Sequence, residues 1–172
     1  IPSPRTILKN GKKLQAGRLI EIENKKVSIE KYFTYYPCEK STDDYTTAQR
    51  KVKDLLKKAV QKRLISDVPL GTFLSGGIDS SIVSAISAKH KSNLETFSIG
   101  FPDESLFDES KYAANVAKHI GSKHHCFQLT NKQLFNHLDQ FLAYLDEPMA
   151  DSSALNVFLL SQETKKHVTV SL

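Results

Sequence analysis

The sequence predicts an α/β domain in which helices cover both faces of a parallel sheet, preceded by a β-hairpin. From residue 67 onward, short apolar segments alternate with stretches of helical periodicity, as in sheets whose parallel strands are joined by crossover helices. Of the 172 residues, 40% are hydrophobic and 25% are charged, which is the composition of an ordinary folded domain. No apolar run approaches the roughly 18 residues of a membrane helix.

The first expected element is the hairpin. Apolar and charged residues alternate in two short segments, 18–23 and 25–33, and Asn24 with Lys25 supplies a tight turn between them. A polar linker follows at 37–44. The chain begins with Ile1 and not with Met, so we expect it to be part of a longer protein. We divide it into residues 1–36, the linker 37–44, and residues 45–172.

Residues 43–65 have the clearest helical pattern, with Ser41 or Thr42 as the expected cap and Asp43 and Asp44 in the first turn. This helix is rich in lysine and arginine, and residues 1–66 carry nine more positive than negative charges. We interpret the basic residues as a solvated face. Nucleic-acid binding is the alternative, but no aromatic residues interleave them as a strand-binding surface would require.

Strands and helices are then expected in alternation. The strands are predicted at 70–74, 94–101, 124–129 and 167–172, and the helices at 79–90, 108–120, 131–145 and 153–165. Gly121 is a natural helix stop, and Thr130 with Gln133 forms a capping box. Because ligands bind at the carboxyl ends of parallel strands, those ends are where we expect the chemistry.

One motif stands at such an end. Leu74-Ser75-Gly76-Gly77-Ile78-Asp79-Ser80-Ser81 follows the first core strand and leads into an amphipathic helix. The glycines allow a sharp turn, and its amides with the helix N-terminus favour an anion. A carboxylate at this place is explained by a hard cation such as Mg²⁺ between it and a phosphate. The motif has no lysine, so it is not the P-loop of kinases.

The motif resembles the pyrophosphate loop of the ATP pyrophosphatase superfamily, which has a Rossmann-like fold of the adenine nucleotide alpha-hydrolase type. Other segments resemble class B, glutamine-hydrolysing asparagine synthetases. They are 68–74 before the loop, 97–101, 107–110, 146–148 with 151–153, and 168–172. Residues 4–33 resemble the last stretch of that family's glutaminase domain. The resemblance makes 45–172 the N-terminal part of a synthetase domain, truncated before its second signature loop.

The resemblance implies a cytoplasmic ligase that uses ATP and Mg²⁺. The side-chain carboxylate of aspartate is adenylated, pyrophosphate leaves, and ammonia from glutamine gives asparagine. A glutaminase domain in the parent chain is the implied partner, and a homodimer is compatible with the family. The two remote cysteines, Cys38 and Cys126, form no metal or disulfide motif, which agrees with a reducing compartment.

The implied ATP-binding residues surround the motif: Phe73, Leu74, Ser75, Gly76, Gly77, Ile78, Asp79, Ser80, Ser81 and Ile99. Backbone groups of Phe73 and Ile99 are expected to frame the adenine, and Asp79 to bind Mg²⁺. Four residues are candidates for a substrate or ribose pocket: Glu109, Asp146, Asp151 and Ser152. The alternative for Asp146, Asp151 and Ser152 is an ordinary loop in which Asp151 or Ser152 caps a helix. No catalytic side chain is expected, because the substrate's carboxylate attacks.

Several alternatives stay open. The family's glutaminase uses an N-terminal cysteine, whereas this chain starts at Ile1, so glutamine hydrolysis is not expected of it. Other functions are a β-lactam-forming or cell-surface-sugar-amidating ligase, a nucleotide-binding module without turnover, or a tRNA-modifying ATP pyrophosphatase. His124 and His125 could bind a metal. We favour two ordinary residues at the start of a strand, because no third ligand lies at helical spacing from them. Cys126 is expected to be small and buried, and Asp103 and Glu104 to be solvated.

Overall fold

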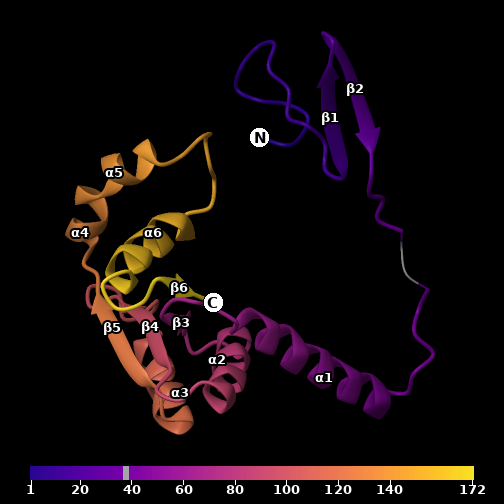
Figure 1. Cartoon of the computed structure of the whole chain (residues 1–172). Helices are drawn as coiled ribbons and strands as arrows, with labels where there is room; N and C mark the ends of the chain where they lie inside the picture. Colours follow the sequence, from indigo (N-terminus) through magenta and orange to yellow (C-terminus); the bar gives the residue numbers. More distant parts are fainter. Residues whose placement is uncertain (37–38) are drawn as a thin grey trace. The chain divides into compact units, whose positions relative to one another are not determined.

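A computed structural model describes residues 1–36 and 39–172, so Cys38 of the predicted linker lies outside the described residues (Figure 1). The chain divides into two compact units. The hairpin unit comprises Ile1–Thr42 with Leu145–Ala150, and the sheet unit comprises Asp43–Tyr144 with Asp151–Leu172. Among the described residues, no helix is long and apolar enough to cross a membrane.

The hairpin unit contains strands β1 (Arg18–Glu23) and β2 (Lys26–Lys31), which pair in antiparallel register. The turn between them places Asn24 at a φ of 49° and Lys25 at a φ of 63°. Two consecutive positive φ values are what a two-residue hairpin turn needs to match the twist of its strands. The expected hairpin is therefore confirmed, and so is its turn.

The sheet unit begins with helix α1 (Tyr45–Arg63). Its cap is Asp44, whose carboxylate accepts a hydrogen bond from the Thr47 amide at 2.7 Å. The prediction of Ser41 or Thr42 as the cap is wrong, because the helix starts two residues later than its apolar pattern indicated. The hydrogen bonds from Thr47 hold the pKa of Asp44 below its ordinary value of 3.8.

The sheet has four strands in the order β5-β4-β3-β6, and all pairs are parallel (Figure 1). The strands are β3 (Leu70–Phe73), β4 (Glu95–Gly100), β5 (Lys123–Gln128) and β6 (Val170–Ser171). The predicted parallel sheet is thus confirmed. Strand β6 is shorter than the expected 167–172, because the amides of His167 and Val168 still bond back to the Thr164 carbonyl.

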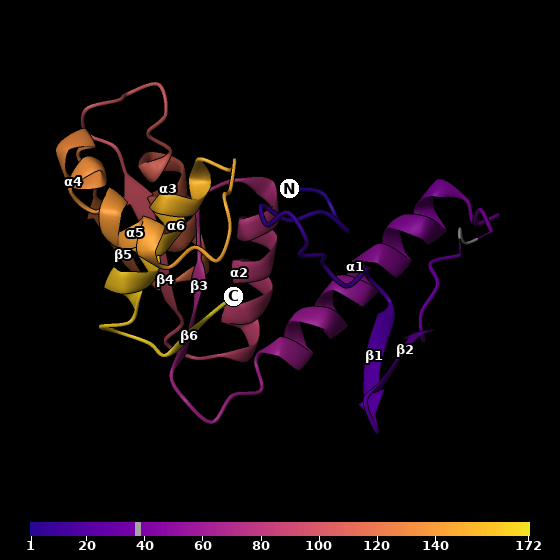
Figure 2. The same cartoon turned by 90° about the horizontal axis from the view of Figure 1, so that it is seen from above.

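Helices lie on both faces of this sheet (Figure 2). On one face, α6 (Ser153–Thr164) contributes Leu160 to a buried cluster with Phe97 and Val168. On the other face, α2 (Ile78–His90) and α3 (Ser110–Ile120) cover Thr72 and Leu74. The alternation of side chains along each strand produces this division.

Gly71 leaves room for the largest buried side chain. A Cβ at Gly71 would lie 2.6 Å from Cε2 of Phe97, a distance that no real packing allows. The glycine in β3 therefore lets the Phe97 ring lie against the neighbouring strand. Phe97 is fully buried at the centre of the α6 face.

The helix ends confirm part of the sequence pattern and correct the rest. Gly121 ends α3 at a φ of 68°, and Thr130 forms the expected capping box with Gln133. The helix expected at 131–145 is broken into α4 (Asn131–Asn136) and α5 (Leu138–Ala143). The break falls at His137, whose backbone N–H and Nδ1 share the Gln133 carbonyl at 3.3 and 2.8 Å.

Cys126 is exposed, so the expectation of a small buried residue is wrong. Its strand, β5, is at the edge of the four-stranded sheet, and an edge strand is covered by fewer neighbours than a central one. The nearby Gln128 donates a hydrogen bond from Nε2 to the Cys126 sulfur at 3.3 Å.

Candidate functional site

The turn between β3 and α2 is held by the backbone at both ends. Leu74 continues the ladder of β3, since its N–H donates to the Phe97 carbonyl at 2.8 Å. Gly76 then takes a left-handed φ of 86°, and Gly77 is the N-cap of α2 in an extended conformation. No side chain among the described residues caps this helix end, so its first N–H groups face outward without an intrahelical acceptor.

Gly76 packs closely against α3. A Cβ at this position would lie 2.5 Å from Cβ of Tyr112 and 2.6 Å from the Ala113 nitrogen. At Gly77 the nearest atom to such a Cβ is Oγ of Ser75, at 3.3 Å. The two glycines therefore differ: Gly76 is required by both space and backbone conformation, whereas Gly77 has an ordinary φ and an added Cβ would press only on the Ser75 hydroxyl.

Serine hydroxyls hold the shape of the turn. Oγ of Ser75 and Oγ of Ser80 are 2.9 Å apart, and Ser80 donates to the Gly77 carbonyl at 3.2 Å. The Gly77 N–H donates to Ser75 Oγ at 3.2 Å, so an anion would compete with this long bond for that amide. The Ser81 hydroxyl is buried and has no hydrogen-bond partner among the described residues, so it is not presented to solvent.

Asp79 lies in the first turn of α2 with an exposed side chain. A carboxylate here is favoured by the helix dipole, and carboxylate oxygens are the ligands that Mg²⁺ prefers. The turn thus combines outward N–H groups, two accessible hydroxyls and one carboxylate. These groups suit a polyphosphate whose charge is partly neutralised by a divalent cation.

A pocket of about 320 Å³ adjoins the turn at the carboxyl ends of β3 and β4. The pocket brings together five of the residues expected at the site, namely Phe73, Leu74, Ser75, Ile99 and Glu109. Its wall also includes residues that the sequence analysis missed, Phe101, Phe107, Ser153, Asn156 and Leu160. Ser153 lies in the family-like segment 151–153, whereas the signal for Asn156 was its spacing of three from Ser153 on the same helix.

The Phe73 backbone is partly occupied. Its N–H donates to the Leu172 carbonyl at 2.8 Å, which leaves its carbonyl as the group that could contact a base without breaking this bond. Glu109 is the N-cap residue of α3, with its side chain exposed. Next to it, Asp108 accepts from the Ser110 amide, and its hydrogen bonds with Ser110 lower its pKa from 3.8.

The remaining candidates have different surroundings. Asp151 accepts hydrogen bonds from the Ser153 amide at 2.9 Å and from its hydroxyl at 2.7 Å, which lowers the pKa of Asp151. Ser152 is the N-cap residue of α6 and makes no side-chain cap bond within the described part of the chain. Asp146 belongs to the hairpin unit, where it lines a pocket with Lys13.

Two acidic residues expected to be solvated have a structural role. Asp103 accepts from the Asn131 amide at 2.9 Å, and Glu104 accepts from the Asn131 side chain at 3.3 Å. Both carboxylates are exposed, but they contact the start of α4. Prediction of this contact from sequence was not possible, because 27 or more positions separate the partners.

His124 and His125 point to opposite faces of β5. His124 lies on the α3 side, with its ring nitrogens 2.9 Å from Thr96 Oγ1 and 3.2 Å from Ser98 Oγ. Burial, followed by the charge of His125, lowers the pKa of His124 from 6.5. His125 is on the α6 side, with Nε2 2.8 Å from the Glu95 carboxylate. The two histidines therefore do not form one metal site together.

Comparison with known proteins identifies the family. The family profile for asparagine synthase matches residues 51–172. The chain is 31% identical to asparagine synthetase [glutamine-hydrolyzing] 1 of Bacillus subtilis over 175 residues, covering 100% of this chain and 27% of that protein. It is 30% identical over 181 residues to asparagine synthetase [glutamine-hydrolyzing] 3 of the same organism, covering 96% and 29%.

Among solved structures, the chain is similar to an NH3-dependent NAD synthetase from Campylobacter jejuni. The sequence identity is 17% and the TM-score 0.40, covering 72% of this chain and 53% of the other. The chain spans less than a third of the length of the two Bacillus relatives. The matched range 51–172 includes α2, α3, the turn at 74–81 and all four strands of the parallel sheet, and on this basis the chain belongs to the asparagine synthase family.

Proposed function

We propose that the full-length protein forms asparagine from aspartate, ATP and ammonia. The observation that carries the proposal is the Ser75–Ser81 turn at the carboxyl end of β3, in a chain of the asparagine synthase family. An oxygen of the aspartate side-chain carboxylate attacks the α-phosphorus of ATP, and the bond to the β-phosphate breaks. Ammonia then attacks the acyl carbon, and AMP leaves with the electron pair of the acyl–oxygen bond.

The turn is proposed to bind the pyrophosphate that leaves. The outward N–H groups at the start of α2 and the Ser75 and Ser80 hydroxyls donate hydrogen bonds to its oxygens. Gly76, wedged against α3, keeps these donors in place before the nucleotide arrives. Asp79 would hold Mg²⁺, which neutralises charge on the phosphates when it is bound.

The adjoining pocket is proposed to hold the nucleoside and the amino-acid substrate. Its apolar wall at Phe73 and Ile99 suits a base, with the Phe73 carbonyl as an acceptor for its exocyclic amine. Glu109 at the same pocket, with Asp151 and Ser152 near the start of α6, is proposed to contact ribose or substrate. The substrate's own carboxylate is the nucleophile, so no side chain of this chain has to attack.

Ammonia is proposed to come from glutamine. Both Bacillus relatives are named glutamine-hydrolyzing, and they are more than three times as long as this chain. A glutaminase domain of the full-length protein, ending near the β1–β2 hairpin, is the proposed source.

The test is aspartate-dependent exchange of radioactive pyrophosphate into ATP by the full-length protein. Asp79→Asn keeps the shape of the side chain but removes its charge, and we expect exchange to fall by about 10²–10³-fold with the fold intact. Asp139→Asn, an exposed carboxylate on α5, is the matched control and should exchange at the normal rate.

The outcome distinguishes this function from its alternatives. Normal exchange by Asp79→Asn would contradict the role of Asp79. Exchange that depends on a carboxylate other than aspartate would indicate another ligase of the family, and ATP binding without any exchange would indicate a nucleotide-binding module.

A further inference from the structure

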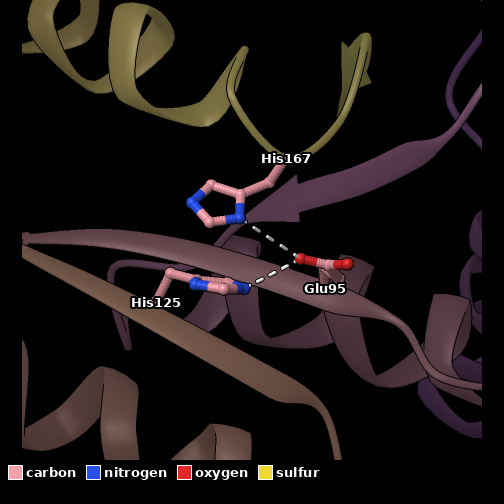
Figure 3. A group of neighbouring side chains, drawn as sticks. All are labelled: Glu95, His125 and His167. Atoms are coloured by element: carbon pink, nitrogen blue, oxygen red, sulfur yellow. Dashed lines mark hydrogen bonds and ion pairs between the residues drawn. The ribbon is translucent and has the colours of Figure 1, made fainter.

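The amino end of the sheet holds a cluster of three side chains that the proposed function does not use (Figure 3). Glu95 is the first residue of β4, His125 lies in β5, and His167 precedes β6. The turn at 74–81 follows the opposite, carboxyl end of β3. The cluster and the proposed nucleotide site therefore lie at opposite ends of the strands.

The ligand atoms of the three residues lie close together. Nε2 of His125 is 2.8 Å from Oε2 of Glu95, and Nδ1 of His167 is 4.0 Å from the same oxygen. All three atoms are within 4.8 Å of one another. A tetrahedral zinc ion bonded at about 2.0–2.1 Å holds its ligand atoms roughly 3.3–3.4 Å apart. Zinc binding therefore requires the Glu95–His125 pair to separate and the His167 ring to move closer to Glu95.

The surroundings hold the two imidazoles in place. His125 stacks on Phe97 with ring centroids 5.1 Å apart and planes 14° apart, and the His167 ring is 4.1 Å from that of His125. The backbone at His167 is tied to the end of α6 by its bond to Thr164. Apolar walls around ligating histidines limit ring motion and water access.

The carboxylate has a second contact that orients it. Oε1 of Glu95 lies 3.5 Å from Nζ of Lys123, while Oε2 faces both histidines (Figure 3). Such outer contacts fix ligating carboxylates in metal sites. The side chains of Glu95, His125 and His167 are 24%, 17% and 31% exposed, so an ion could enter from solvent and keep a water as its fourth ligand.

We infer that Glu95, His125 and His167 form a binding site for a transition-metal ion, with Zn²⁺ as its representative. Two imidazole nitrogens and one carboxylate oxygen suit zinc and not Mg²⁺, which prefers oxygen ligands. His125 ligates through Nε2 and His167 through Nδ1, each as a neutral imidazole whose ligating nitrogen carries no proton. The ion links β4 and β5 to the segment that leads from α6 to the two-residue strand β6.

The experiment is calorimetric titration of the purified chain with ZnCl₂, with MgCl₂ as the comparison ion. We expect one Zn²⁺ per chain, a rise in melting temperature with Zn²⁺, and neither effect with Mg²⁺. His125→Gln, His167→Gln and Glu95→Gln should each weaken Zn²⁺ binding by at least about tenfold, since each removes one ligand. His119→Gln, an exposed histidine on α3, is the matched control and should bind as the unaltered chain does.

A spectroscopic measurement guards against a variant that fails to fold. Co²⁺ added to the unaltered chain should give the intense visible bands of a four-coordinate site, and Zn²⁺ should abolish them. His167→Gln, which changes the most exposed of the three side chains, should lose the bands while keeping its circular dichroism. The inference is overturned if the unaltered chain binds no Zn²⁺, if Co²⁺ gives only the weak bands of the hydrated ion, or if a folded His167→Gln protein binds Zn²⁺ normally. None of these outcomes depends on the proposed synthetase reaction.

Discussion

At the scale of single residues, the turn after β3 depends on where a side chain can be accommodated. Gly76 has both a left-handed φ and the backbone of α3 within 2.6 Å of any added Cβ. Gly121 has a left-handed φ but open space around it, and Gly77 has an ordinary φ and only the Ser75 hydroxyl close to an added Cβ. The three glycines thus separate the cost of backbone strain from the cost of a steric clash.

We expect alanine at these positions to lower the free energy of unfolding in a fixed order. Gly121→Ala should cost about 1–2 kcal/mol from the left-handed backbone alone. Gly76→Ala should cost about 1–3 kcal/mol more, because α3 or the turn must move. Gly77→Ala should stay within about 1 kcal/mol of the unaltered chain. Urea unfolding followed by circular dichroism measures all three, and equal losses at Gly76 and Gly121 would show that the contact with Tyr112 is not restrictive.

At the scale of elements, helix ends in the sheet unit are fixed by side chains that accept backbone hydrogen bonds. Asp44 bonds to the Thr47 amide, Asp108 to the Ser110 amide and Asp151 to the Ser153 amide. In each case these bonds lower the pKa of the carboxyl group from 3.8. Such bonds are stronger to the charged carboxylate than to the neutral acid, so protonation weakens them.

The start of α1 should therefore become less stable in acid. Because the pKa of Asp44 is lower in the folded chain, its contribution is present above 3.8, the ordinary value, and is lost as pH falls through the folded-state pKa. Asp44→Asn keeps a capping oxygen that does not titrate. We expect the urea midpoint of the unaltered chain to fall more between about pH 7 and about pH 3 than that of Asp44→Asn.

Asp54→Asn, which changes an exposed carboxylate inside α1, is the control and should follow the unaltered chain. The same pH dependence in the Asp44→Asn and Asp54→Asn proteins would show that the Asp44 cap does not matter for stability.

At the scale of the whole molecule, stability of the sheet unit centres on Phe97. This side chain is 0% exposed and packs with Leu160 and Val168 on the α6 face. Phe97→Ala should lower the free energy of unfolding by about 3–5 kcal/mol, because it removes a buried ring and leaves a cavity. Phe135→Ala removes a ring that is 75% exposed and should change stability by no more than about 0.5 kcal/mol.

Thermal unfolding of the two proteins tests this difference. A melting temperature for Phe97→Ala close to that of Phe135→Ala would mean that the packing of Phe97 on Leu160 and Val168 does not stabilise the sheet unit. Since His125 stacks on Phe97, the same substitution should also disturb the three-residue cluster at the amino end of the sheet.

The sequence by itself determined the features that depend on neighbouring residues. The alternation of strands and helices, the Gly121 stop, the Thr130–Gln133 capping box and the turn at 74–81 each arise within a few positions of chain. Local backbone preference and side-chain chemistry decide such features. The position of the turn at a strand's carboxyl end followed as well, because crossover helices force the strands to be parallel.

Only the tertiary structure decided the features that join distant residues. The short β6, the bond from Phe73 to Leu172, the pocket wall from α6 and the grouping of Glu95 with His125 and His167 all need strands to be placed side by side. The break at His137 is a local feature, but the apolar periodicity of residues 131–145 predicted one continuous helix there. Strand order and register set which side chains face each other. Glu95, His125 and His167 are 30 to 72 positions apart in the sequence, and they meet because the sheet places β4, β5 and the approach to β6 side by side.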